Sequence, residues 1–119
     1  MNETYISFYL KASRIHVFVD SLRSIGNPRL VRFLISNDGS SLAMVPCSKK
    51  DFHSHRIPQS VYSGKGKMEI SSMKLCTVIA GLHAWDITRS YRVPGVLREG
   101  INAVLFDLNK AEEIEKDDE

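Results

Sequence analysis

The order strand–helix–strand–strand occurs twice in this chain, and this repetition limits the possible folds more than any other feature. The first occurrence spans residues 15–45 and is preceded by one more strand, and the second spans residues 67–108. Two interpretations remain open: a duplicated unit, or an ordinary α+β sheet in which strands and helices alternate. Each helix has one apolar stripe to bury, so we predict an α+β fold, a mostly antiparallel sheet with two helices on one face.

The strands are predicted from period-two alternation and from turn residues. Residues 4–12 alternate between polar and apolar side chains, which is typical of a half-buried strand, and residues 15–19 are its predicted hairpin partner. Residues 30–35 are apolar on both faces and predict a central strand. The Asn37-Asp38-Gly39 turn, whose residues tolerate positive φ, then joins this strand to a partner over residues 42–45.

Two helices are predicted from capping residues and apolar periodicity. A short helix over residues 21–25 begins at Asp20 or Ser21. A longer helix over residues 73–85 follows the capping pair Ser71-Ser72. Its predicted buried stripe consists of Leu75, Val78, Ile79, Leu82 and Trp85. The predicted core residues of the last strand are Val104, Phe106 and Leu108.

Length and composition indicate one globular domain. The chain has 119 residues, of which 43% are hydrophobic and 25% are charged, as in an ordinary folded domain. We expect a single α+β domain over residues 1–108, with halves 1–46 and 67–108 joined by a basic loop, 47–66, and an acidic tail over 109–119. A loop of this length is uncommon in a compact domain, so it is functional or contains a short extra element.

Cysteine usage and hydropathy bear on the compartment. The two cysteines, Cys47 and Cys76, are far apart and form no CxxC motif, which favours a reducing compartment over a disulfide framework. No apolar run approaches the roughly 18 residues of a membrane span. We therefore expect a cytoplasmic protein without a membrane partner.

Positive charge is concentrated in the first part of the chain. Residues 1–66 contain nine Lys/Arg and four Asp/Glu, whereas residues 67–119 contain seven and ten. Because Lys and Arg neutralise phosphates, the predicted nucleic-acid contacts are Arg14, Arg23, Arg29, Arg32, Lys49, Lys50, Arg56, Lys65 and Lys67. The alternative is that these are solvated loop cations, with Arg32 neutralised inside the sheet. The acidic last eight residues are either a solvated terminus or a phosphate mimic that screens a basic surface.

Metal binding and catalysis are less well supported by the sequence. Cys47, His53 and His55 are weak candidates for a metal site, which Cys76 and His83 would complete, but their spacing matches no structural zinc pattern. No nucleophile elbow, phosphate loop or zinc-protease motif occurs. We therefore predict a non-enzymatic protein without cofactor or metal. An enzyme that uses His53 and His55 remains a third alternative.

Residues 14–46 resemble the swapped-hairpin DNA-binding domains of the AbrB, SpoVT and MraZ kind. The matching segments are Arg14 to Val17, Leu22 to Gly26, Leu30 to Ile35, Asp38-Gly39 and Leu42 to Pro46. The sequence departs from the family pattern at Phe18, where a proline is expected, and at Asn27-Pro28-Arg29, which replaces a Gly-Asp step. The resemblance implies a dimer that presents arginines to DNA and acts as a transcription regulator or antitoxin.

Taken together, these features predict a small DNA-binding homodimer that contacts phosphates through basic hairpin and loop residues. The alternative is a protein-binding inhibitor or adaptor encoded by a mobile element, of the anti-CRISPR type, whose target would be a protein such as a nuclease. Small size, segregated charge and the lack of a catalytic motif support this alternative, and its contacts would be made by a protein surface.

Overall fold

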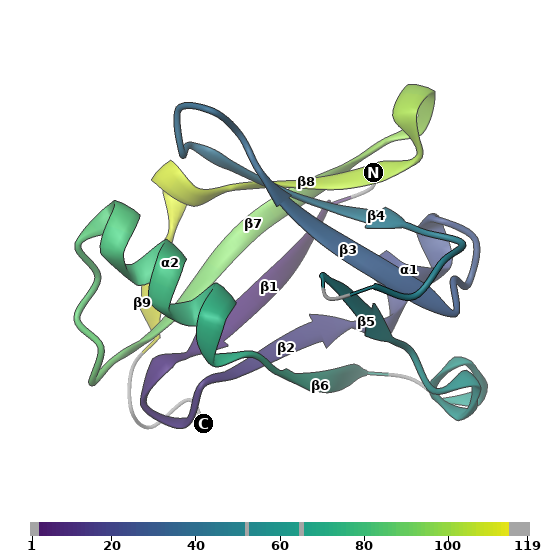
Figure 1. The fold of residues 1–119 in the computed structure, drawn as a ribbon, viewed down its shortest axis with the longest axis horizontal. Helices are drawn as coiled ribbons and strands as arrows, with labels where there is room; N and C mark the ends of the chain where they lie inside the picture. The colour runs from purple at the N-terminus through teal and green to yellow at the C-terminus, as the bar shows by residue number, and fades with distance from the viewer. Residues whose placement is uncertain (1–2, 52, 65, 115–119) are drawn as a thin grey trace.

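A single curved antiparallel sheet dominates the fold (Figure 1). The computed structural model describes residues 3–51, 53–64 and 66–114. The strands are β1 (Glu3–Tyr9), β2 (Arg14–Phe18), β3 (Leu30–Ile35), β4 (Ser41–Pro46), β5 (Ser54–Arg56), β6 (Lys67–Ser71), β7 (Ser90–Arg98), β8 (Ala103–Asp107) and β9 (Glu112–Ile114). The helices are α1 (Val19–Ser24), α2 (Met73–His83) and the 3-10 turns η1 (Leu10–Ala12), η2 (Gln59–Ser63), η3 (Glu99–Ile101) and η4 (Leu108–Lys110).

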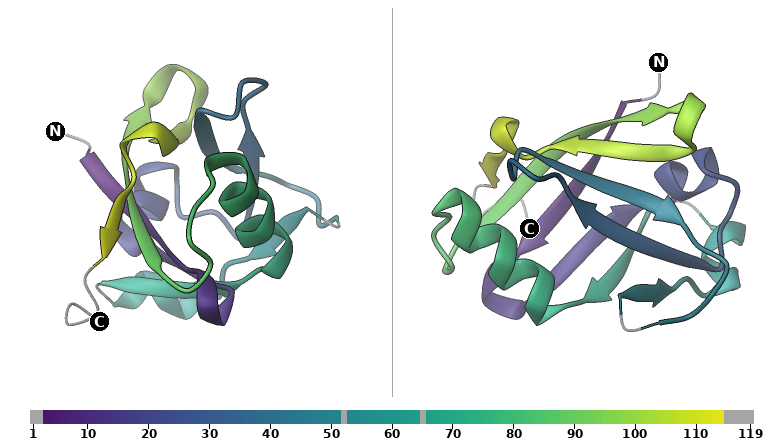
Figure 2. Two further views of the ribbon diagram at one scale, coloured as in Figure 1. Left: turned by 90° about the vertical axis from the view of Figure 1, so that its left-hand side faces the viewer. Right: turned by 45° about the horizontal axis from the view of Figure 1, so that its top comes forward.

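The predicted α+β layering with two helices on one face is wrong. The sheet runs in the order β5-β3-β4-β8-β7-β1-β2-β6, with β9 paired to β7, and it curves into a nearly closed barrel. The helices α1 and α2 lie on different sides of this barrel (Figures 1 and 2). A sheet that curves onto itself covers its own inner face, so the helices are not needed as a common covering layer.

The strand pairings follow a twofold pattern between the two halves of the chain. β2 pairs with β6 and β4 pairs with β8, while β1 pairs with β7 and β5 pairs with β3. The hairpins β3–β4 and β7–β8 correspond to each other. The pattern breaks at two places among the described residues: β1 pairs with β2, whereas β5 and β6 do not pair, and β9 pairs with β7 without a counterpart on β3. The barrel is therefore open between β5 and β6.

The core fills the inside of the barrel with alternate residues of its strands. The predicted hairpins β1–β2 and β3–β4 are confirmed, and Val104, Phe106 and Leu108 are buried as predicted. The largest fully buried side chains are Phe8, Phe106, Ile6, Ile15, Leu22, Leu42, Met44, Ile57, Ile79, Leu108, Val17 and Val31. Because successive strand side chains alternate between faces, the polar positions of β1, β2 and β7 point outward.

The orientation of α2 differs from the prediction. Ser72 is the N-cap, and its hydroxyl accepts a hydrogen bond from the Leu75 backbone N–H at 3.2 Å. The buried residues of α2 are Cys76, Ile79 and Ala80, while Val78 and Leu82 of the predicted stripe are exposed. A helix with apolar residues on more than one face leaves its orientation to be decided by the neighbouring sheet.

Other element boundaries also differ from the prediction. The first strand ends at Tyr9, because η1 begins at Leu10. Helix α1 starts at Val19 with Phe18 at the N-cap position and has no side-chain cap, so neither predicted cap residue caps it. The long basic loop contains the short elements β5 and η2, in agreement with the second of the two possibilities for a loop of that length.

The β3–β4 turn is stabilised by the carboxylate of Asp38. Its Oδ1 accepts hydrogen bonds from the Ser40 N–H at 3.0 Å, the Ser40 hydroxyl at 2.7 Å and the Ser36 hydroxyl at 2.7 Å. The Ser40 backbone N–H and these two hydroxyls lower the pKa of Asp38 to about 2. A carboxyl whose pKa is lower in the folded than in the unfolded state stabilises the fold at pH values above its unfolded pKa.

We expect Asp38→Asn to lower the thermal stability at neutral pH, and we expect this difference to shrink as the pH falls through about 2. The carboxylate contributes fully above its ordinary pKa of 3.8 and loses its contribution as the pH falls toward about 2. Thermal unfolding of both proteins across this pH range, followed by circular dichroism, measures the difference. A stability difference that is constant with pH would show that the turn does not depend on the charge.

Candidate nucleic-acid interface

The opening of the barrel between β5 and β6, which we call the seam, is bridged by residues 57–64. Ile57 donates its N–H to the Arg29 carbonyl at 2.8 Å, and the Tyr62 hydroxyl donates to the Pro28 carbonyl at 2.7 Å. β5 is only three residues long, and Pro58, which lacks an N–H, cannot donate to a strand ladder. Two hydrogen bonds thus hold residues 57–64 next to the start of β3, and no continuous strand closes the barrel at the seam.

Three predicted cations meet beside the seam. Arg29, Lys50 and Arg56 are exposed and line one shallow hollow together with Leu30, Ile57, Pro58 and Gln59. Arg56 is brought there by the β3–β5 pairing, in which it lies opposite Leu30, the residue after Arg29. Among the described residues, none of these three cations forms an ion pair. Within the part of the chain that the structure describes, their positive charge is therefore exposed to solvent without a partner.

A neighbouring hollow adds Lys49 to this surface. It is lined by Arg32, Pro46, Cys47, Ser48 and Lys49. Arg32 forms an ion pair with Asp51, which neutralises it, whereas Lys49 has no ion pair among the described residues. The environment of Arg32 therefore fits the alternative from the sequence analysis, a cation neutralised inside the sheet, better than it fits a phosphate contact.

Asp51 fixes the conformation of the segment that carries the lysines. Its side chain accepts a hydrogen bond from the His53 backbone N–H at 2.8 Å, and its own N–H donates to the Ser54 hydroxyl at 2.9 Å. The His53 N–H and, to a smaller extent, the charge of Arg32 lower the pKa of Asp51. The one carboxylate near Lys49 and Lys50 in the sequence is thus engaged by Arg32 and by this turn.

The structure separates the remaining predicted contacts from this surface. Arg14 forms an ion pair with Glu69 at 2.9 Å. Arg23 pairs with Asp20 at 2.8 Å and donates to the carbonyl oxygens of Tyr62 and Gly64, so it supports the residues that bridge the seam. Lys67 is exposed at the start of β6, and Lys65 lies outside the described residues.

The candidate metal ligands do not converge. In the described part of the chain, no group of three or more His, Cys, Asp or Glu is placed to hold a metal ion. His53 is exposed in a turn, whereas His55 is half-buried with its ring 5.5 Å from that of Phe33, and this burial lowers the pKa of His55. Cys76 is buried, which raises the pKa of its thiol to about 11, and Cys47 is half-buried.

Sequence reasoning missed one cross-strand row of polar residues. Ser7, His16 and Glu69 are register partners on β1, β2 and β6, and His16 Nε2 lies 3.2 Å from Glu69 Oε1. This order of a hydroxyl, an imidazole and a carboxylate suggests a nucleophile and base. However, Ser7 is only 7% exposed, and no hydrogen bond joins Ser7 to His16 in the described structure. The row acts as a contact that holds β6 to β2.

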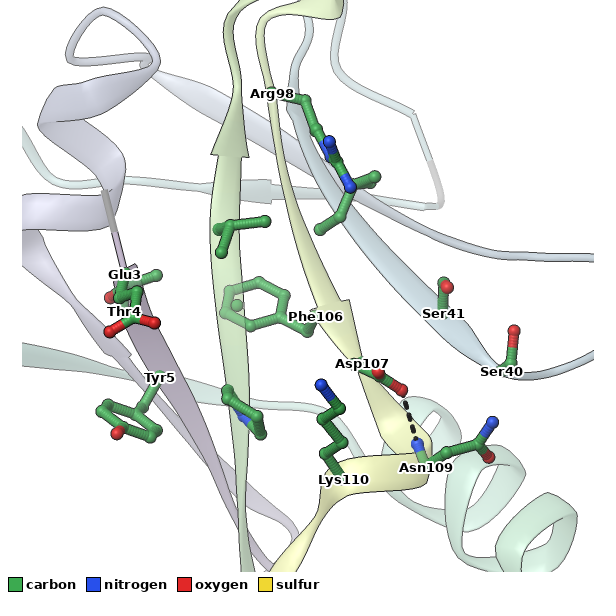
Figure 3. A pocket seen from close by; sticks show the side chains of 14 residues that line it. Glu3, Thr4, Tyr5, Ser40, Ser41, Arg98, Phe106, Asp107, Asn109 and Lys110 are labelled. Carbon is green, nitrogen blue, oxygen red and sulfur yellow. Dashed lines mark hydrogen bonds between the residues drawn. The ribbon is translucent and has the colours of Figure 1, made fainter. Parts of the chain in front are cut away.

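A cleft of about 450 Å³ lies on the outer face of the barrel, across β1, β7, β8 and β4 (Figure 3). Glu3 and Asp107 line it together with Arg98 and Lys110, and Tyr5 forms part of one wall. Because the cleft carries two carboxylates and two cations, it has no net charge to attract a polyanion. The seam is the better candidate for phosphate binding.

Comparison with known proteins identifies no relative: no family model, curated protein or solved structure matches this chain. The class that the fold defines is a nearly closed antiparallel β-barrel with two short α-helices. The resemblance of residues 14–46 to swapped-hairpin domains stays a prediction. No helix in the described ranges 3–51, 53–64 and 66–114 is long and apolar enough to cross a membrane.

Proposed function

We propose that this protein binds duplex DNA through the phosphate backbone, with Arg29, Lys49, Lys50 and Arg56 as the contacts. The observation that carries the proposal is the convergence of Arg29, Lys50 and Arg56 on one hollow, where none of them pairs with a carboxylate of the described residues. Such contacts set affinity and orientation and carry no base sequence information.

The physical case rests on availability and placement of charge. The guanidinium of arginine presents donors in a fork that matches phosphate oxygens. Arg29, directly before β3, and Arg56, at the end of the neighbouring strand β5, are both exposed. Neighbouring strands lie about 4.8 Å apart, so side chains of this length can reach adjacent phosphates of one DNA strand. Arg14, Arg23 and Arg32 are not part of the proposed interface because carboxylates or carbonyl groups already occupy them.

The number of contacts predicts the salt dependence. Four phosphate contacts give a slope of about −3.6 in a plot of log Kobs against log salt concentration, so the affinity falls about 150-fold between about 50 and 200 mM salt. Fluorescence anisotropy of a labelled duplex at several salt concentrations measures this slope. A flat dependence, or no binding at low salt, would refute the proposal.

Charge reversal at the seam tests the location. We expect Lys50→Glu with Arg56→Glu to reduce the slope to about −1.8 or less and to abolish binding at physiological salt, and Lys49→Glu with Lys50→Glu to abolish it likewise. The matched control is Lys74→Glu with Lys110→Glu, which makes the same change of net charge at α2 and η4. Equal losses in the seam and control variants would mean that overall charge, not the seam, determines binding.

One observation favours the protein-binding alternative. Val78 (42% exposed) and Leu82 (55% exposed) lie four residues apart on one face of α2, and exposed apolar groups that gather on one surface often mark a protein interface. Under this alternative, the protein inhibits or recruits a protein target. Val78→Asp with Leu82→Asp would then abolish a stoichiometric protein complex and leave salt-dependent DNA binding unchanged, whereas the seam variants would do the reverse.

A further inference from the structure

A row of apolar side chains crosses four strands on the outside of the barrel. Leu34 of β3 lies opposite Ala43 of β4, which lies opposite Leu105 of β8, which lies opposite Val96 of β7. We call these four residues the outer row. Leu34 is 49% exposed and Val96 is 38% exposed, and Ala43 and Leu105 are half-buried. Direct cross-strand partners lie about 5 Å apart, so the row is continuous.

Opposite charges lie on the two sides of the outer row. Arg98 follows Val96 by two residues on β7, and Asp107 follows Leu105 by two residues on the antiparallel strand β8. Their side chains therefore point to the same outer face from opposite sides of the row (Figure 3). Arg98 is the register partner of Ala103, four residues from Asp107, so about 13 Å separates the two positions. Within one chain they are too far apart to pair.

We propose that a second copy of this chain docks on the outer row and forms a twofold symmetric dimer. The twofold axis runs along the row and lies in the plane of the contact. Each row residue then meets the same residue of the second copy, and the Arg98 side of one copy meets the Asp107 side of the other. Arg98 of each copy then faces the region of Asp107 in the other copy, where Lys110 of η4 also lines the cleft (Figure 3). The contact joins apolar side chains to two equivalent ion pairs that one chain cannot form.

This surface also differs from the one that a swapped-hairpin dimer uses. The hairpins β3–β4 and β7–β8 already pair with each other through β4 and β8 of a single chain, so they have no free partner edge there to exchange. The contact proposed here uses a face of the sheet instead of these strand edges. The proposal does not depend on DNA binding, because the seam and the outer row involve different residues.

The size of the surface predicts a weak dimer. Four strands spaced about 4.8 Å apart and three rows spaced about 6.8 Å apart outline roughly 400 Å² per copy, or about 800 Å² in total, which is below the roughly 1,000 Å² of a stable specific interface and typical of a weak contact. We expect a dissociation constant on the order of 10–100 µM. Glu3 of β1 is the register partner of Val96 and would face its own copy, so Glu3→Gln is expected to tighten the dimer about twofold to fivefold.

Paired charge reversal tests the geometry by sedimentation velocity over a concentration series. We expect Arg98→Asp and Asp107→Arg each to be monomeric, because each places like charges opposite each other across the axis. An equimolar mixture of the two variants is expected to form a heterodimer, because both ion pairs are then restored. Lys74→Asp, which changes the same charge on α2, is the matched control and is expected to dimerise like the wild type.

Three results would each overturn the proposal. The first is a wild-type protein that is monomeric at about 1 mM, well above the expected dissociation constant, and the second is a mixture of the two variants that stays monomeric. The third is a dimer that is dissociated by Val78→Asp with Leu82→Asp but not by Arg98→Asp. Because Asp107 accepts a hydrogen bond from the Asn109 N–H at 3.0 Å, Asp107→Arg is first checked for folding by circular dichroism. If it does not fold, Leu34→Glu at the exposed end of the row replaces it, and this variant must be monomeric.

Discussion

Replacing Phe106 with alanine is expected to lower the free energy of unfolding by about 3–5 kcal/mol. Phe106 is fully buried on β8, opposite Leu42 of β4 and Gly95 of β7. Loss of the ring removes apolar surface from the core and leaves a cavity between strands that pair on both sides and cannot readily move inward. This is a large part of the roughly 5–15 kcal/mol by which a domain of this kind is stable.

Urea denaturation followed by circular dichroism measures this change. The matched control is Leu34→Ala on the outer face of β3, where the side chain is half exposed and the expected change is below about 1 kcal/mol. If Phe106→Ala had an effect as small as that of the control, the ring would not lie in the core as described.

The second large effect is expected for Gly95→Ala, which should lower the stability by about 1–3 kcal/mol. A Cβ atom at Gly95 would lie 2.7 Å from Cε1 of Phe106 and 3.0 Å from the Leu105 carbonyl oxygen. The ring is buried and the carbonyl belongs to the sheet, so neither can move away at low cost. Alanine usually stabilises a strand relative to glycine, so the sign of the change depends on this close approach.

Two comparisons make the Gly95 prediction specific. Gly81→Ala, in the exposed part of α2 where no heavy atom lies within 4 Å of the new Cβ, is expected to raise the stability by about 1 kcal/mol. Phe106→Leu is expected to be less destabilising in the Gly95→Ala background than alone, because the smaller side chain relieves the overlap. Additive effects of Gly95→Ala and Phe106→Leu in the double variant would contradict contact between the two residues.

Much of the local structure was predictable because it depends on neighbours in the sequence. Alternation of side chains identified β1 and the core face of β8, and the Asn37-Asp38-Gly39 turn identified the β3–β4 hairpin. Ser72 was predictable as a cap because its hydroxyl satisfies an N–H three residues later. By contrast, Phe18 at the start of α1 offers no capping signal, so that boundary was missed.

The sequence indicated that a candidate interface would consist of Lys and Arg, but it did not indicate which of these residues lie together. The sequence analysis named nine cations as candidate contacts, and the structure brings Arg29, Lys50 and Arg56 to one hollow while it pairs others with carboxylates. Arg14 meets Glu69 only because β2 pairs with β6, 55 positions later in the chain. The outer row was invisible in the sequence for the same reason, since its four residues belong to four strands.

Local sterics and hydrogen bonding act within a few residues, so the amino-acid sequence read alone determined where most strands and turns occur and which residues of β8 are buried. The tertiary structure decided the closure of the sheet into a barrel, the buried face of α2 and the carboxylate that each arginine meets. These features depend on pairings between strands far apart in the chain, such as β1 with β7 and β4 with β8. Each such pairing is selected by the free energy of the whole packed core, which no short segment contains.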